Sequence, residues 1–154
     1  MFHPMRRNDR EKTKEEALDI LAKGSYGILC TLGENGYPAG TPLNYVSDVG
    51  SIYVHFAKGN ALESATKHPK VGFTVVTRSD VVPSEFVTNY ESVMVYGRAV
   101  ELHGQQKYDA LYLLIKKYSP GFEESGIEHI KEDIDKCHVL KISIDHLTGK
   151  GRTG

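Results

Sequence analysis

The sequence predicts a mainly β fold of the α+β class: a six-stranded antiparallel β-barrel with peripheral helices. Two observations lead to this prediction. Six short runs rich in β-branched and aromatic residues are separated by turns that contain glycine or asparagine. Helical patterns are few and do not alternate with the strands, which argues against a doubly wound α/β sheet. Closing the sheet into a barrel removes the edges that a small open sheet would expose.

Length and composition limit the kinds of protein this chain can be. With 154 residues it is expected to form a single domain, residues 1–154, around one hydrophobic core. The 19 Lys and Arg residues balance 20 Asp and Glu residues, so net charge gives no reason to expect nucleic-acid binding. No apolar run reaches the length of a membrane span, and residues 1–10 are too charged for a signal peptide. We therefore expect a cytoplasmic protein without membrane contact, in which Cys30 and Cys137 are reduced.

The first part of the chain predicts a helix and a hairpin. Thr13 and Glu16 have the spacing of a capping box, which predicts a helix up to about residue 23 that ends at Gly24. A first strand is predicted at residues 26–32, and the Asn35-Gly36 pair that follows it is typical of a hairpin turn.

Residues 38–57 predict two further strands with a turn at residues 47–50. The first of them carries the run Pro42, Leu43, Asn44 and Tyr45. The second ends in the run Tyr53-Val54-His55-Phe56-Ala57. A short helix is predicted over residues 61–68, because Pro69 disfavours helical backbone at the residue before it.

The second half of the chain predicts three strands and two helices. Strands are expected at residues 70–78 and 91–102, on either side of a loop at residues 79–89. Helical spacing of apolar residues then predicts two helices, with stripes formed by Tyr108, Leu111, Tyr112 and Ile115 and by Ile127, Ile130 and Ile134. Residues 138–146 alternate between apolar and polar side chains, as a last strand would.

The loop after the second strand of residues 38–57 has the features of an anion site. Lys58, Gly59 and Asn60 lead into the predicted helix that begins at Ala61. Free N–H groups at the start of a helix, together with the helix dipole, attract a phosphate. His55 lies at the end of the preceding strand, close enough to serve such a ligand. A hydrogen-bonded structural histidine is the alternative interpretation.

Other familiar patterns do not apply. Residues 149–154 match G-x-G-x-x-G on paper, but no helix can follow them, so a dinucleotide site is not predicted. The seven histidines are scattered and lack the spacing of metal ligands, so no metal site is expected.

Five motifs follow one another in order along nearly the whole chain. They are the basic stretch at residues 5–10, Pro42-Leu43-Asn44-Tyr45, residues 52–57 with His55, Ser92-Val93 with Gly97, and Leu147-Thr148-Gly149-Lys150. In this order they resemble the nitroimidazole-resistance (Nim-type) proteins of the pyridoxamine 5'-phosphate oxidase-related, FMN-binding split-barrel family.

The resemblance implies a split barrel that binds FMN at the interface of a homodimer. His55 is then expected to be the catalytic residue beside the flavin ring, as a proton donor or a group that orients the substrate. The cofactor-binding residues that the resemblance implies are Pro42, Leu43, Asn44, Tyr45, His55, Ala57, Lys58, Gly59, Asn60, Ala61, Ser92 and Lys150.

The chain departs from the family pattern at one position. Family members commonly carry a phosphate-binding lysine two residues after the loop glycine, where this chain has Ala61. Lys58, Asn60 and the N–H groups that begin the helix are the expected replacements. The same change leaves room for FAD in place of FMN.

The resemblance implies a flavin-dependent oxidoreductase that acts on a small molecule, with a nitroaromatic compound as one candidate substrate. Three alternatives stay open. The first is a haem-binding split barrel in which His55 or another histidine binds iron, and the second is a non-catalytic flavin-binding or sensing protein. The third, a pyridoxamine 5'-phosphate oxidase, lacks here the arginine pattern expected for its substrate.

Overall fold

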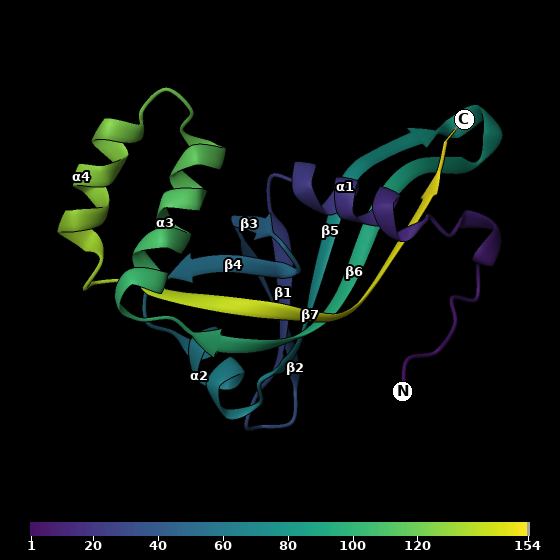
Figure 1. Cartoon of the computed structure of the whole chain (residues 1–154). Helices are drawn as coiled ribbons and strands as arrows, with labels where there is room; N and C mark the ends of the chain where they lie inside the picture. Colours follow the sequence, from purple (N-terminus) through teal and green to yellow (C-terminus); the bar gives the residue numbers. More distant parts are fainter. Residues whose placement is uncertain (154) are drawn as a thin grey trace.

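A computed structural model describes residues 1–153, so Gly154, the last position of the rejected 149–154 pattern, lies outside the described residues. Its framework is one antiparallel sheet of seven strands in the order β2-β1-β5-β6-β7-β4-β3 (Figure 1). The predicted mainly β split-barrel class is confirmed, and the sheet has seven strands where six were expected.

The elements follow the predicted order closely. The strands are β1 Gly27–Leu32, β2 Pro38–Leu43, β3 Tyr45–Asp48, β4 Ser51–Phe56, β5 Lys70–Val82, β6 Val87–Glu101 and β7 His138–Arg152. The helices are α1 Lys14–Lys23, α2 Asn60–Lys67, α3 Gly104–Tyr118 and α4 Glu123–Asp133, with 3-10 turns η1 Asn8–Arg10 and η2 Pro83–Glu85. The predicted capping box of α1 is present, since the Thr13 hydroxyl accepts from the N–H of Glu16 and the Glu16 carboxylate accepts from the N–H of Thr13.

The seventh strand arises because the predicted strand through Pro42–Tyr45 divides at Asn44. Strand β2 pairs with β1 at one edge of the sheet, whereas β3 pairs with β4 at the other edge. A single residue joins the two edge strands, so the sheet must curl until its edges meet. The Asn44 side chain donates to the carbonyl oxygen of Ser25 at 3.0 Å, which holds this corner in place. The result is a barrel that is split between β2 and β3.

The loop predicted at residues 79–89 is wrong. Strands β5 and β6 continue as a ladder up to the pair Val82 and Val87, and η2 makes the tight connection between them. The hairpin is rich in β-branched residues, which favour extended backbone. It projects from one end of the molecule, beside the C-terminal half of β7 (Figure 1).

Strand β7 also runs further than the predicted residues 138–146. Its last residues pair with β6 as far as Arg152 and Tyr90. Gly149 lies against α1, because a Cβ atom added there would come 2.8 Å from Cβ of Ala17. Close packing on α1 therefore explains a glycine within this strand.

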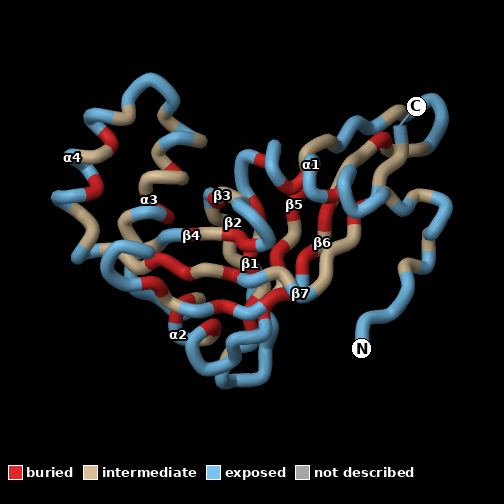
Figure 2. The backbone as a smooth tube through the Cα atoms, viewed as in Figure 1, coloured by how far each residue is buried: buried red, intermediate tan, exposed pale blue. Residues whose placement is uncertain are grey.

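Two hydrophobic clusters stabilise the fold. The first fills the barrel and contains Leu29, Tyr45, Ile52 and Phe73, with α1 and α2 packed against it. The second lies on the outer side of β4 and β7, where α3 and α4 form a hairpin that covers Val139. Buried residues follow the sheet strands and the inner sides of these helices (Figure 2). Among residues 1–153, no helix is both long enough and apolar enough to cross a membrane.

Candidate functional site

The predicted site residues fall into two groups at opposite ends of the protomer. His55 pairs with Val139 of β7, whereas Ser92 pairs with Lys150 of the same strand. Eleven positions separate Val139 from Lys150, which corresponds to roughly 36 Å of extended strand. The first group lies on the side of α2 and the α3–α4 hairpin, and the second lies near both termini (Figure 1).

The first group surrounds the start of helix α2. The helix begins at Asn60, one residue before the predicted start, and Gly59 is its N-cap with extended backbone. No side chain caps this end, and a Cβ atom at Gly59 would have no neighbour within 4 Å. Ala57, Lys58, Gly59 and Asn60 are all exposed. The N–H groups of the first turn therefore face open space, as an anion site requires, although Glu63 in the same turn opposes a negative charge.

His55 points from the outer side of β4 toward the α3–α4 hairpin. It lines a cavity of about 280 Å³ together with His129, Asp133 and Cys137. Partial burial lowers the pKa of the His55 imidazole, and the nearby His129 lowers that pKa further. Within residues 1–153 its side chain has no hydrogen-bond partner, so the interpretation as a satisfied structural histidine has no support from the contacts.

The four residues from Pro42 to Tyr45 differ in how far they are buried. Pro42 and Asn44 are exposed and Leu43 is half-buried. The Tyr45 ring is fully buried, packs edge-on against Phe73 at 5.1 Å and donates its hydroxyl to the Leu21 carbonyl oxygen. This burial also raises the pKa of the phenol.

The backbone N–H and carbonyl groups of Tyr45 are hydrogen-bonded as well. Its N–H donates to the hydroxyl of Tyr118 at 2.9 Å, and its carbonyl oxygen accepts from the Lys117 ammonium at 2.8 Å. Tyr45 therefore has neither an accessible ring nor a free backbone polar group for a ligand, whereas Pro42, Leu43 and Asn44 keep accessible surface.

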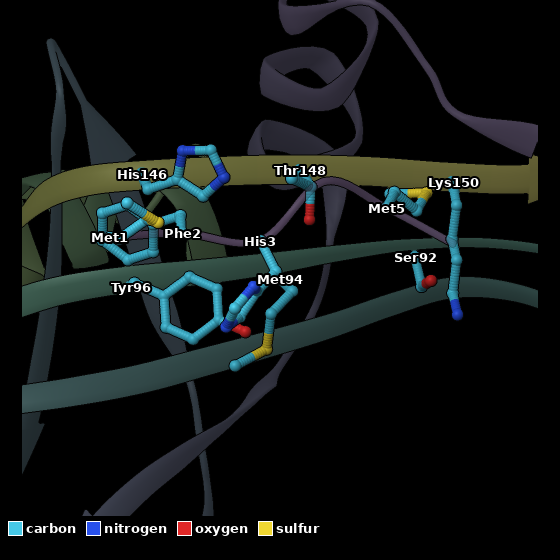
Figure 3. A pocket seen from close by; sticks show the side chains of 10 residues that line it. All are labelled: Met1, Phe2, His3, Met5, Ser92, Met94, Tyr96, His146, Thr148 and Lys150. Carbon is cyan, nitrogen blue, oxygen red and sulfur yellow. The ribbon is translucent and has the colours of Figure 1, made fainter. Parts of the chain in front are cut away.

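The second group lies on the outer face of β6 and β7. Ser92 and Lys150 are register partners, and both line a cavity of about 490 Å³ whose floor continues through Met94, Tyr96, Thr148 and His146. The N-terminal residues Met1 to Met5 cover it from outside. Ser92 and Lys150 lie at one end of this cavity and the aromatic side chains at the other (Figure 3).

Sequence reasoning missed the aromatic end of this second group. The Phe2 ring stacks on His146 with centroids 4.4 Å apart at 11°, and lies 5.2 Å from the ring of Tyr96. The sequence did contain one sign of this group, because Ser92, Met94 and Tyr96 are spaced two residues apart. This spacing places the three side chains on one face of a strand. Recognising their partners required the register of β7.

Metal-binding side chains do not gather anywhere in the described residues 1–153, where no group of three His, Cys, Asp or Glu residues is placed to hold an ion. Both cysteines are free thiols.

The sequence was compared with models of known protein families. Residues 13–151 match the family model described as pyridoxamine 5'-phosphate oxidase, so the chain belongs to this family. Among curated proteins, no sequence matches significantly.

Solved structures share the fold over nearly the whole chain. A candidate 5-nitroimidazole antibiotic resistance protein from Bacteroides thetaiotaomicron is 18% identical with a TM-score of 0.74, covering 98% of this chain and 96% of its own. A FAD-binding protein from Mesorhizobium loti is 20% identical with a TM-score of 0.69, covering 94% of this chain and 98% of its own. The flavocytochrome Anf3 from Azotobacter vinelandii is 23% identical with a TM-score of 0.81, covering 99% of this chain and 73% of its own. Identities this low show a common fold.

Proposed function

We propose that this protein is a homodimeric flavoprotein that binds FMN between its protomers and uses it to reduce a small molecule. One observation carries the proposal. The residues that could contact a flavin form two half-sites at opposite ends of one protomer, so a second copy must supply the missing half of each site. Membership of the pyridoxamine 5'-phosphate oxidase family and the FAD-binding neighbour support a flavin as the ligand.

The phosphate fits the open start of helix α2. The uncapped N–H groups after Gly59 are free to donate to phosphate oxygens, and Lys58 supplies a positive charge beside them. These groups replace the lysine that the family commonly places at position 61. Because Gly59 has open space in front of it, the longer phosphate chain of FAD would also find room.

The flavin ring would lie between the two half-sites. One protomer would contribute the exposed surface of Pro42, Leu43 and Asn44, and the other Ser92 and Lys150 from its β6–β7 face. When bound, the flavin supplies the electron transfer, and the protein holds and orients it. His55 would orient the substrate and exchange a proton with it. Its lowered pKa makes the neutral imidazole the main form near neutral pH.

Exposed apolar side chains support a dimer interface. On the projecting β5–β6 hairpin, Val81 is 69% exposed and Phe86 is 94% exposed. Contiguous exposed apolar surface on a protein marks interaction sites, so this hairpin is a candidate part of the dimer interface. A stable dimer would bury on the order of 1,000 Å² or more.

The proposed reaction is the flavin-dependent reduction of a small aromatic compound in the cytoplasm, with nitroaromatic compounds as candidates. Their support is the fold shared with the candidate 5-nitroimidazole antibiotic resistance protein. Haem binding is the second candidate, favoured by the free imidazole of His55 and by the shared fold of a flavocytochrome.

The absorption spectrum of the purified protein tests the cofactor. We expect the visible absorption bands of a flavin, or quenched flavin fluorescence when FMN or FAD is titrated into colourless protein. A Soret band in place of flavin bands would support the haem alternative. Protein that takes up neither flavin would contradict the proposal.

A further inference from the structure

The cavity beside His55 lies outside the barrel, between strand β4 and the α3–α4 hairpin. Its volume is about 280 Å³. Its walls are aliphatic and come from two helices, with Leu111, Leu114 and Ile115 from α3 and Ile130 and Ile134 from the end of α4. Ligand sites of small molecules are concave, mostly apolar and carry a few convergent polar groups. This cavity has that character.

Its size selects a compact ligand. A dry aliphatic cavity of about 150 Å³ is enough for benzene, and drug-sized ligands occupy about 300 Å³ or more. A single aromatic ring with one polar substituent therefore fits this cavity, whereas a complete FMN molecule, as a drug-sized ligand, calls for a larger one. The cavity is thus suited to a substrate rather than to the cofactor.

The polar groups at its rim are mostly basic. Asp133 is the one carboxylate of the lining, and it is already paired, with its Oδ2 atom 3.2 Å from His129 Nε2 and its Oδ1 atom 3.8 Å from Lys136 Nζ. His55 faces this rim without a partner among residues 1–153. The Lys136 ammonium and the Asp133 carboxylate offset each other, which leaves the two imidazoles as the groups that can meet a ligand. Each imidazole can donate an N–H to an anionic substituent, and each attracts that substituent once it is protonated.

The other elements around His55 add no further carboxylate. Helix α3 contributes only aliphatic side chains to the lining. Cys137 is also present, and burial raises the pKa of its thiol, which keeps it neutral. On β4 the next outward residue is Tyr53, and its register partner on β7 is Lys141, a further positive charge.

We propose that this cavity binds the substrate as a single-ring aromatic carboxylate, with the ring among the leucine and isoleucine side chains and the carboxylate on His55. The proposal deepens the proposed function and rests on it for the role of the ligand as substrate. Binding itself requires only the cavity. An anion beside His55 favours its protonated form, so binding takes up a proton and tightens as the pH falls toward 6.

The test uses benzoate as the probe and the full chain, with and without FMN. Calorimetry measures the affinity, and NMR follows the His55 ring resonances. We expect benzoate to shift these resonances and to bind more tightly at about pH 6 than at about pH 7.5. Benzyl alcohol, which keeps the ring, and acetate, which keeps the charge, should each bind at least about tenfold more weakly than benzoate.

Two variants locate the site. His55→Gln should weaken benzoate binding at least about tenfold and remove its pH dependence, because a hydrogen bond to a charged group is lost. His103→Gln, at an exposed histidine outside the cavity, is the matched control and should bind as the wild type does. Ile134→Trp fills the cavity from a half-buried helix end and should abolish binding while His55 is retained. Thermal melts confirm that each variant is folded.

The outcomes separate this proposal from the flavin proposal. Benzoate binding that depends on His55 and on Ile134 supports the cavity as a ligand site, whether or not FMN is taken up. Equal binding to wild type and His55→Gln, or no binding in a protein that takes up FMN normally, overturns the proposal and leaves the flavin function standing. Uptake of benzoate without any uptake of flavin contradicts the proposed function instead.

Discussion

At the scale of single residues, His55 differs from an ordinary strand histidine because its imidazole is free. It lies on the outer side of β4, partly buried against the α3–α4 hairpin, and donates to no group within residues 1–153. A histidine that holds the fold together is expected to hydrogen-bond to the protein, whereas His55 is solvent-exposed and makes no such bond among the described residues. The imidazole nitrogen atoms of His55 are therefore free to hydrogen-bond to a ligand.

Replacing His55 by alanine tests its role. We expect His55→Ala to leave the melting temperature of the flavin-free protein nearly unchanged, because the residue is exposed and makes no hydrogen bond to the protein among residues 1–153. Flavin-dependent reduction of a nitroaromatic compound should slow by about a hundredfold or more, since a positioned proton donor contributes on this order. Stopped-flow reoxidation of the reduced flavin measures the rate per bound flavin. If His55→Ala lowers the melting temperature and leaves the rate of flavin reoxidation unchanged, His55 has a structural role and not a catalytic one.

Lys117 is a second unusual residue, with a structural consequence. Its ammonium group lies 3.8 Å above the Tyr45 ring and donates to the Tyr45 carbonyl oxygen at 2.8 Å. Burial lowers the pKa of this lysine to about 8 from 10.5. Between these two values the unfolded chain holds the proton more tightly than the folded protein does. The contribution of Lys117 to stability therefore rises with pH across this range.

The variant Lys117→Met removes this titration and keeps the length of the side chain. We expect the free energy of unfolding of the wild type to rise, relative to the variant, as the pH increases from about 8 to about 10.5. Urea denaturation at several pH values measures the difference, and Lys116→Met on the exposed side of the same helix is the control. Parallel pH profiles for wild type and Lys117→Met would contradict the assigned burial.

At the scale of elements, the start of α2 is the feature that the proposed phosphate contact depends on. It lacks a side-chain cap, and the chain has glycine at the N-cap position. Aspartate and serine both cap helices well, so either substitution at Gly59 should keep or slightly raise the stability of the helix. Only aspartate adds a negative charge.

We therefore predict that Gly59→Asp and Gly59→Ser separate helix stability from phosphate binding. Gly59→Asp should weaken FMN binding at least about tenfold through charge repulsion, whereas Gly59→Ser should change it less. Fluorescence titration with FMN gives the affinities, and riboflavin, which has no phosphate, should bind both variants alike. If Gly59→Asp binds FMN as tightly as Gly59→Ser, the phosphate does not lie at this helix.

The elements also show what the sequence could and could not predict. The capping box at Thr13, the Asn35-Gly36 turn and the helix stripes are local signals, and the structure confirms them. The break at Asn44 was missed because it depends on where the two flanking strands pair, at opposite edges of the sheet. The loop predicted at residues 79–89 was wrong because a ladder between β5 and β6 outweighs the turn-forming residues near Pro83.

The candidate site follows the same rule. The open start of α2 could be predicted, since loop and helix are contiguous in the chain. The grouping of Phe2 with Tyr96 and His146 could not, because three distant segments meet there. The cavity beside His55 was missed for a similar reason, as the sequence does not say which face of the sheet the α3–α4 hairpin covers.

At the scale of the whole molecule, the separation of the two half-sites is the basis of the proposed dimer. The α2 group and the Ser92–Lys150 group are too far apart along β7 to hold one flavin within a protomer. In the proposed two-fold dimer, the first group of each protomer would meet the second group of its partner, which would create two equivalent sites. Sedimentation should accordingly show a dimer at micromolar concentration, and a flavin-loaded monomer would contradict this arrangement.

The most direct test of the shared site is a heterodimer of two damaged protomers. Gly59→Asp damages the α2 half-site, and Lys150→Glu damages the β6–β7 half-site, so each homodimer should bind FMN weakly. A heterodimer carrying one of each, isolated with two different affinity tags, combines both defects in one site and leaves the other site intact. Titration with FMN should then show one site of wild-type affinity per dimer. A heterodimer that binds FMN as weakly as both homodimers would mean that the two half-sites belong to the same protomer, and would contradict the shared site.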